Sequence, residues 1–484
     1  MKANASKRTL FITVGAIVVV GIGGYAGLSS MAQAKAEDTY NELKSELEKN
    51  DKSLRISKES ISAGVLSQSA RVENLKINSN YSGNPLELSA DSIRIKASSE
   101  KLSSLIGEGV DISYTERQSS LSVKTVSIED LTYEDAQLIA DVIAGRASEE
   151  EIISGIKNLH TGPVKLAGIK MRESVNRADI EKLGFESIEE GNLYGFGIEN
   201  GTFSATRVGG KEVYSIEDAR LGAASLLTAL GVASNPPEDT TKVADSFVKG
   251  FEYTDGDIVF GVDNASFDDV ESVDGKMTAG TINVGGISIT KPDPLPEGWS
   301  QSAAADIFNF FESERVDMRY SSSMDIDPET GQFDLVLEGS VDNAGSMNVS
   351  VSVASYPFEQ VSSMETNPQN PLAPVIIGFQ QSDGLEGLSF TYEDEGIIER
   401  VIEQSGGREA IAAQTGAMIN GFGSMFNFDD RQMLIRGIND FLEGRERFHL
   451  ELSPDSPKTL VELQQIIGTG SRLSQEAGFD VQGR

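Results

Sequence analysis

Arg71–Ile77 reads RVENLKI and Ser92–Ala97 reads SIRIKA, and this short pattern decides the fold expected for most of the chain. Both segments alternate apolar and polar residues, as do residues 85–88 between them. A period of two is typical of a β-strand with one buried face and one solvated face. Such strands are common in antiparallel sheets, so we predict long antiparallel strands from residue 51 onward.

A weak internal repeat follows from the same pattern. An acidic residue followed by Asn opens three segments, at Glu73-Asn74, Glu199-Asn200 and Asp263-Asn264. Each segment leads through a Gly-containing turn to a second alternating stretch, and these stretches are Leu86–Ile95, Val213–Leu221 and Met277–Ile289. The repeat predicts pairs of long strands that extend one sheet, while chance recurrence in a β-rich chain is the open alternative.

Helical patterns interrupt the strands. Residues 36–50 place Tyr40, Leu43 and Leu47 at helical spacing, and further helices are predicted at Glu134–Ala144, Ser148–Leu159, Ile216–Leu230 and Ala303–Phe311. Ser148 and Glu151 form a capping-box pattern. Beyond a linker-like stretch at residues 367–374, helices are predicted at Gly396–Phe426, Asp429–Leu442 and Lys458–Ile467, with strands at Leu388–Tyr392 and Phe448–Leu452.

These patterns predict an α+β fold: a long antiparallel, partly repetitive sheet with inserted helices, an N-terminal transmembrane helix and a helical C-terminal region. The predicted parts are a cytoplasmic tip and anchor (1–35), a juxtamembrane helix (36–50), a β-rich body (51–365), a mainly helical region (385–467) and a loose tail (468–484).

The N-terminus predicts where the protein resides. Lys2, Lys7 and Arg8 precede an uncharged run at residues 10–28, which is long enough to span a membrane as a helix. The positive flank predicts a cytoplasmic N-terminus, with the remaining chain beyond a bacterial inner membrane. Ala32-Gln33-Ala34 fits a signal-peptidase site, so cleavage is the alternative to a retained anchor.

Composition limits the partners and the chemistry. The 75 acidic and 41 basic residues give a net charge of −34, which argues against nucleic-acid binding and favours a highly soluble body. Cysteine is absent from the sequence, which excludes disulfides, Cys-ligated metals and thiol nucleophiles.

Sequence motifs for catalysis, cofactors or metals are lacking, and we assign no residues to these roles. The two histidines, His160 and His449, have no ligand partner at i+3 or i+4, and the chain has no G-x-S-x-G elbow. Asp325 opens a calcium-loop-like segment, but Thr330 and Val336 occupy the positions that require Gly and Glu. A hairpin turn at residues 327–331 is therefore expected.

The N-terminal 77 residues resemble the start of the YdgA-like family of bacterial envelope proteins of unknown function. The shared features are the hydrophobic run, the spacing of Tyr40, Leu43 and Leu47, and a strand–turn–strand whose parts are Ser60, Ser62-Ala63-Gly64 and Ser69-Ala70-Arg71-Val72. Val65 departs from the family pattern, which has an aromatic residue after the glycine. The alternating strands also resemble the wider AsmA-like proteins, and the end of the predicted strand at Leu452-Ser453-Pro454 resembles alphaproteobacterial members. The resemblance implies an anchored, β-rich periplasmic body.

The function predicted from these observations is non-enzymatic. We expect an inner-membrane-anchored periplasmic protein, attached through residues 10–28, that acts as a scaffold or holds lipid in a groove of its sheet. One alternative is an envelope assembly factor that binds a protein through residues 385–467. A second alternative is a hydrolase with a dispersed acidic site.

Overall fold

The computed structural model divides into two compact units, residues 1–255 and 256–484. It describes residues 54–64, 69–81, 84–97, 101–114, 118–132, 149–207, 210–225, 245–255, 258–273, 276–293, 299–362, 373–421, 427–444 and 446–483, with single positions between 37 and 49 and at 134, 135, 138 and 295.

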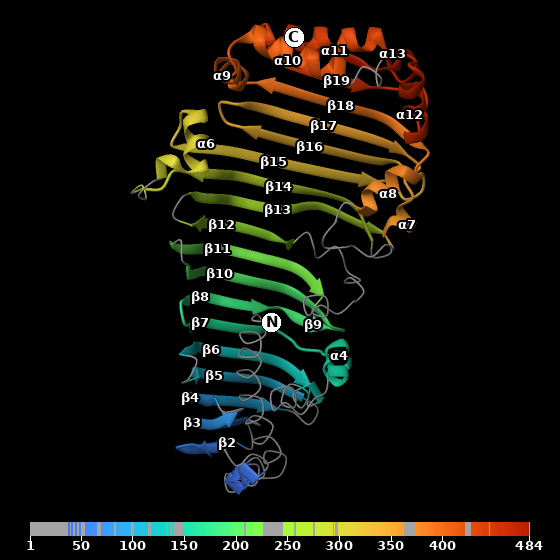
Figure 1. Cartoon of the computed structure of the whole chain (residues 1–484). Helices are drawn as coiled ribbons and strands as arrows, with labels where there is room; N and C mark the ends of the chain where they lie inside the picture. Colours follow the sequence, from blue (N-terminus) through green and yellow to red (C-terminus); the bar gives the residue numbers. More distant parts are fainter. Residues whose placement is uncertain are drawn as a thin grey trace. The chain divides into compact units, whose positions relative to one another are not determined.

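Unit 1 is an antiparallel sheet in which strands that follow one another in sequence mostly pair with one another (Figure 1). Its strands are β1 (Arg55–Ser57), β2 (Ser60–Gly64), β3 (Ser69–Tyr81), β4 (Asn84–Ala97), β5 (Lys101–Tyr114), β6 (Ser119–Thr132), β7 (Val164–Glu173), β8 (Asn176–Phe185), β9 (Ser187–Glu189), β10 (Asn192–Arg207), β11 (Gly210–Ser225) and β12 (Phe247–Thr254). Helix α4 (Glu149–Lys157) connects β6 to β7.

Unit 2 is a second run of antiparallel strands with helices against one face. The strands are β13 (Val259–Val273), β14 (Lys276–Thr290), β15 (Arg315–Ile326), β16 (Phe333–Val341), β17 (Gly345–Ala354), β18 (Gly384–Asp394), β19 (Arg447–Leu452) and β20 (Asp480–Gly483). The helices are η2 (Trp299–Gln301), α6 (Ala303–Phe311), α7 (Phe358–Ser362), α8 (Ala373–Gln381), α9 (Ile397–Gln404), α10 (Arg408–Gly421), α11 (Phe428–Leu442), α12 (Leu460–Thr469) and α13 (Leu473–Glu476).

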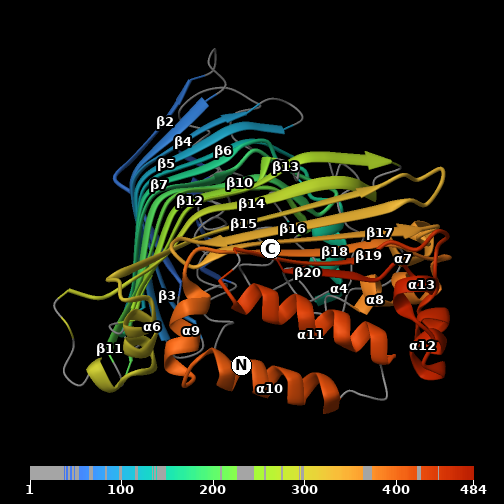
Figure 2. The ribbon, with the colours of Figure 1, turned by 90° about the horizontal axis from the view of Figure 1, so that it is seen from above.

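A line of left-handed residues crosses the middle of the unit 1 strands, and we call this line the crease. It places Asn74, Gly109, Gly168, Asn200 and Gly250 at φ values of 48–63° on β3, β5, β7, β10 and β12, which is every second strand of the sheet. Asn and Gly are the residues that adopt this conformation at least cost. The strand register is the same on both sides of each of these residues, so no residue is inserted there. Figure 2 shows these strands bending near mid-length.

Side chains from the intervening strands fill the space above the crease glycines. A Cβ built on Gly109 would overlap Asp91, and one on Gly168 or Gly250 would contact Lys124 or Glu217 closer than 3 Å. At Asn200 the amide donates to the Glu181 carboxylate at 2.6 Å. Each crease glycine therefore excludes a larger residue both by backbone conformation and by lack of space.

The crease also shifts the phase of apolar alternation, so that both halves of each strand bury the same face. On β4, Leu88 and Ala90 are followed by Ile93 and Ile95, with two residues between Ala90 and Ile93. These four side chains are at most 2% exposed and belong to the unit 1 core. The spacing repeats on the neighbouring strands, with Val72 and Leu75, Val123 and Val126, and Leu166 and Ile169 all buried.

The α+β prediction is wrong, because the described residues are dominated by long antiparallel strands to which the helices are short additions. The predicted helix Ile216–Leu230 overlaps β11, whose backbone pairs with β10 from Gly210 to Ser225. Its Ala- and Leu-rich sequence favours a helix, but pairing along the whole length of β10 overrides that local preference. The predicted turn at Ser62-Ala63-Gly64 is strand as well, since β2 pairs with β3 as far as Gly64.

Several predicted elements are confirmed. The three repeat segments form the hairpins β3–β4, β10–β11 and β13–β14, and the helix at Ala303–Phe311 is α6. The predicted turn after Asp325 is also present. There the Asp327 carboxylate accepts the Thr330 hydroxyl at 2.8 Å and the Glu329 N–H at 2.8 Å. These hydrogen bonds lower the pKa of Asp327, and the bond from the Thr330 hydroxyl has the larger effect.

The predicted anchor at residues 10–28 lies outside the described residues. Among the residues that the structure does describe, no helix has the length and apolarity needed to cross a membrane. The described positions between Glu37 and Lys49 are helical, and Tyr40 is only 7% exposed within the unit 1 core. Burial, followed by the charges of Glu48 and Glu37, raises the pKa of Tyr40 to about 12.

The chain end is ordered, so the prediction of a loose tail from residue 468 is wrong. β20 pairs with β19, and α11 packs on β20 so closely that a Cβ on Gly437 would lie 2.5 Å from Val481. The fully buried Asp430 carboxylate accepts the N–H of Leu473 at 2.7 Å and the hydroxyl of Ser474 at 2.8 Å. A hydrophobic cluster that contains Ala477 and Phe479 completes this packing.

Replacing a left-handed glycine in unit 2 should destabilise that unit. Gly286 on β14 has a φ of 62°, and a Cβ there would overlap the Asp263 carboxylate. We expect Gly286→Ala to lower the free energy of unfolding by about 1–3 kcal/mol, as followed by the fluorescence of the single tryptophan, Trp299. Gly416→Ala is the matched control, because this α10 glycine has open space around it and alanine favours a helix by up to about 1 kcal/mol. Equal destabilisation by both substitutions would contradict this role for Gly286.

Candidate functional site

The sheet of unit 2 has one polar face and one apolar face, and strand register aligns the side chains of each face into rows. The central polar row contains Ser266, Asn283, Ser321, Glu338, Asn348, Thr391, His449 and Gln482, each opposite the next on the neighbouring strand. Residues one position away in the sequence point to the other face, because strand side chains alternate.

Hydrogen bonds connect the polar row from strand to strand. The Ser321 hydroxyl donates to Asn283 Oδ1 at 2.9 Å, and Asn348 Nδ2 donates to Glu338 Oε1 at 2.9 Å. Thr391 Oγ1 lies 2.9 Å from His449 Nδ1. These side chains therefore largely satisfy one another on the solvated face.

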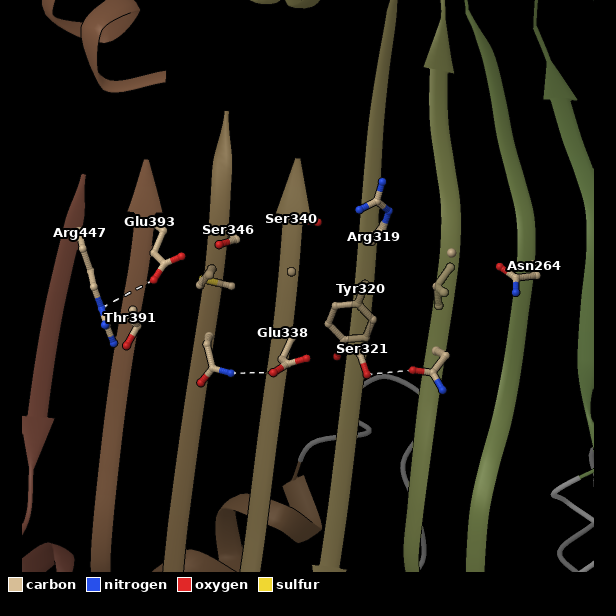
Figure 3. Close-up of a pocket in the computed structure, with 16 residues that line it drawn as sticks. Asn264, Arg319, Tyr320, Ser321, Glu338, Ser340, Ser346, Thr391, Glu393 and Arg447 are labelled. Carbon is tan, nitrogen blue, oxygen red and sulfur yellow. Dashed lines mark hydrogen bonds and ion pairs between the residues drawn. The ribbon is translucent and has the colours of Figure 1, made fainter. Parts of the chain in front are cut away.

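A shallow depression of about 710 Å³ lies over this polar face (Figure 3). A second row of side chains borders it, in which Ser340 and Ser346 face each other between Arg319 and Glu393. Arg319 lies 3.7 Å from Asp342, and Arg447 lies 3.8 Å from Glu393. Each arginine of the depression therefore lies next to a carboxylate.

The polar face does not assemble a serine-hydrolase-like centre. Thr391, His449 and Glu451 occupy the places of the hydroxyl, the imidazole and the carboxylate of a triad. However, His449 Nε2 is 3.6 Å from the Glu451 carboxylate, which is too long for a hydrogen bond. The strands that carry these residues pair on both sides, so their backbone N–H groups are used in the sheet rather than presented to an oxyanion.

The two buried carboxylates of the described ranges do not form a pair. The buried carboxylates there, Asp135 and Asp430, belong to different units. Burial raises the pKa of Asp135, whereas the hydrogen bond from the Thr132 hydroxyl lowers it by a smaller amount. These surroundings are typical of a structural acid beside the start of a helix. Within the same ranges, no three His, Asp or Glu side chains gather to hold a metal ion.

The apolar face presents a partly open surface, which we call the apolar strip. The strip consists of Ile282, Val284, Tyr320, Leu337, Met347, Val349 and Phe390, together with Ser322 and Gly339, which lie in the same two rows. Ile282, Tyr320 and Met347 are 38%, 41% and 42% exposed. No position in the strip carries a charge, although 24% of the chain is charged.

Helices cover the apolar face on either side of the strip. Toward one end of the strands, Phe333 and Tyr356 stack at 4.7 Å and Phe379 of α8 packs edge-on against Phe333 at 5.5 Å. Toward the other end, Phe308 of α6 and Trp299 form a cluster with Ile289. At β18, Phe441 of α11 packs against Tyr392 and Phe448.

Sequence alternation predicted an apolar face but could not locate its open part. Which rows stay exposed depends on where α6, α8 and α11 pack, and alternation within the strands does not specify that packing. A detectable signal was the absence of charge at the inward positions of four consecutive segments, 280–284, 318–324, 335–339 and 347–351.

Comparison with known proteins identifies only the C-terminal part of the chain. A protein-family model described as "Uncharacterized protein" matches residues 338–482, from β16 to β20. No curated protein matches the chain. The match fits a protein whose function is unknown, and it gives no specific support to the YdgA-like or AsmA-like resemblance.

The polar row should make the stability of unit 2 depend on pH. Hydrogen bonds from Ser266 at 2.6 Å and Asn283 at 2.8 Å lower the pKa of Asp268 below its ordinary value of 3.8. The ionised Asp268 therefore stabilises the folded state of unit 2 fully above pH 3.8, the ordinary pKa that it has in the unfolded chain. This contribution is lost as the pH falls through the lowered pKa of the folded state. We expect Asp268→Asn to reduce the loss of stability between neutral and acidic pH, measured by urea unfolding. Asp269→Asn is the control, and an identical change in both variants would contradict the assignment.

Proposed function

We propose that this chain is a non-enzymatic envelope protein that holds the acyl part of an amphipathic molecule on the apolar strip. The observation that carries the proposal is an uncharged strip, open at Ile282, Tyr320 and Met347, on a chain with a net charge of −34. Contiguous exposed apolar surface is one of the marks of a ligand-binding groove.

An acyl chain fits the chemistry of the strip better than a peptide does. A bound peptide has backbone N–H and C=O groups that need partners, whereas the strip offers only the hydroxyls of Tyr320 and Ser322 among apolar side chains. Backbone groups of the central strands are already paired with neighbouring strands. A hydrocarbon chain has no polar groups that need hydrogen-bond partners, so its contact with the strip is favourable in proportion to the apolar area covered.

The proposed location is the periplasmic side of a bacterial inner membrane. The uncharged run at residues 10–28 and its basic flank support attachment of the N-terminus with the body beyond the membrane. The likeness to YdgA-like and AsmA-like proteins is part of this proposal. We expect the membrane fraction to contain chains with an intact N-terminus, read by N-terminal sequencing. Chains that begin at Lys35 would show cleavage and a released body.

A charge placed in the strip should abolish acyl binding. We expect Met347→Asp to weaken binding of a dansyl-labelled fatty acid to the full chain by at least tenfold, because burying an unpaired carboxylate costs several kcal/mol. Fluorescence titration measures the affinity. Asn348→Asp is the matched control, since this adjacent residue points to the polar face, and it should bind as the unmodified chain does. Equal affinity in both variants and the unmodified chain would overturn the proposal.

A further inference from the structure

The crease of unit 1 contains two kinds of residue that alternate from strand to strand. Between its left-handed residues the line passes through charged residues on the intervening strands, which are Asp91 on β4, Lys124 on β6, Glu181 on β8 and Glu217 on β11. The strand registers place each of these residues opposite a left-handed Asn or Gly on both neighbouring strands. All four charged residues are exposed, so the line lies on the solvated face of the sheet.

Each charged side chain packs on the left-handed residue of the next long strand in the chain. The Glu181 carboxylate accepts a hydrogen bond from the Asn200 amide, and Glu59, the residue before β2, accepts one from the Asn74 amide. A Cβ built on each crease glycine is nearest to the charged residue of the preceding long strand, and these contacts are Gly109 with Asp91, Gly168 with Lys124, and Gly250 with Glu217. The contacts join the strands into the pairs β2–β3, β4–β5, β6–β7, β8–β10 and β11–β12.

The same kind of strand pair occurs in unit 2. The register of β13 and β14 places Asp263 opposite Gly286, which has a φ of 62°. A Cβ built on Gly286 would overlap the Asp263 carboxylate, as one on Gly109 would overlap Asp91. This recurrence indicates that the pair, rather than the single strand, is the repeating element of the chain.

Strands from different pairs carry matching patterns of burial around the crease. On β3, Val72 and Leu75 are buried on either side of the crease residue, and on β6, Val123 and Val126 are buried in the same way. Because β3 and β6 run in opposite directions, alignment of their crease residues would place Val72 opposite Val126 and Leu75 opposite Val123. The two strands are therefore suited to pair directly, although β4 and β5 separate them in the structure.

We infer that the sheet of unit 1 is a tandem array of interchangeable strand pairs, and that alignment of their crease residues sets the register between pairs. The burial pattern shifts at the crease on every strand, so only this alignment keeps the buried residues of neighbouring strands on one face. The array can therefore change length by whole pairs, each about 10 Å wide. This inference goes beyond the acyl-binding proposal and does not rest on it.

Deletion of a strand pair from the full chain tests the inference. Removing residues 79–113 places Asn74 five positions before Tyr114, where Gly109 lies in the intact chain. The turn into β6 is retained, and Asn74 takes the place of Gly109 opposite Lys124. We expect cooperative thermal unfolding of unit 1, followed by far-UV circular dichroism, because the buried residues of β3 and β6 then face one another.

Removal of residues 81–113 is the matched control. It retains two more residues, which leaves the alternation of faces unchanged but moves Asn74 opposite the buried Val126. We expect the 79–113 deletion to have a thermal midpoint at least about 10 °C above that of the control, since the control misaligns the burial patterns of the two strands. The fluorescence of Trp299 reports the folding of unit 2 separately.

Equal midpoints for the two deletions would overturn the role of crease alignment. Failure of both deletions to fold, or a control that is the more stable of the two, would overturn the interchangeability of the strand pairs. Because no ligand takes part in these measurements, their result is independent of the acyl-binding proposal.

Discussion

The structure of unit 1 depends on one backbone constraint, the left-handed residue placed at mid-strand on alternate strands. At each of these residues one or two pairs are missing from the ladder, while the pairs on either side keep the same register. In unit 1 these residues align from Asn74 to Gly250, so the strands bend along a common line. On both sides of this line the strands bury the same face, because successive buried residues are three positions apart where they cross it, as at Ala90 and Ile93.

Much of the fold could be predicted from alternation, and the rest could not for identifiable reasons. The hairpins opened by Glu73-Asn74, Glu199-Asn200 and Asp263-Asn264 were visible as a weak repeat, and two of these asparagines are crease residues. The phase slip between Ala90 and Ile93 was also present in the sequence, although a strict period of two obscures it. The β11 segment was predicted as a helix because local propensity does not register pairing with β10, which lies across a hairpin. Order at Ala477 and Val481 depends on contacts with α11, more than 30 residues earlier.

The same alternation that builds the sheet gives unit 2 two faces with different chemistry. On the polar face, neighbouring side chains hydrogen-bond to one another, so residues such as Glu338 and Asn348 are solvated and satisfied. On the apolar face, helices cover both flanks and leave Tyr320 and Met347 open. No catalytic residues were predicted from the sequence. The candidate site could not be located from the sequence because it is defined by what the helices leave uncovered.

Native mass spectrometry of the full chain, purified from its own cells, tests the central claim most directly. The proposal predicts a population whose mass exceeds that of the polypeptide by one acyl-bearing molecule, and the loss of that population in Met347→Asp but not in Asn348→Asp. A single species at the polypeptide mass, or an adduct that is equally abundant in both variants, would contradict the assignment of the apolar strip as a binding site.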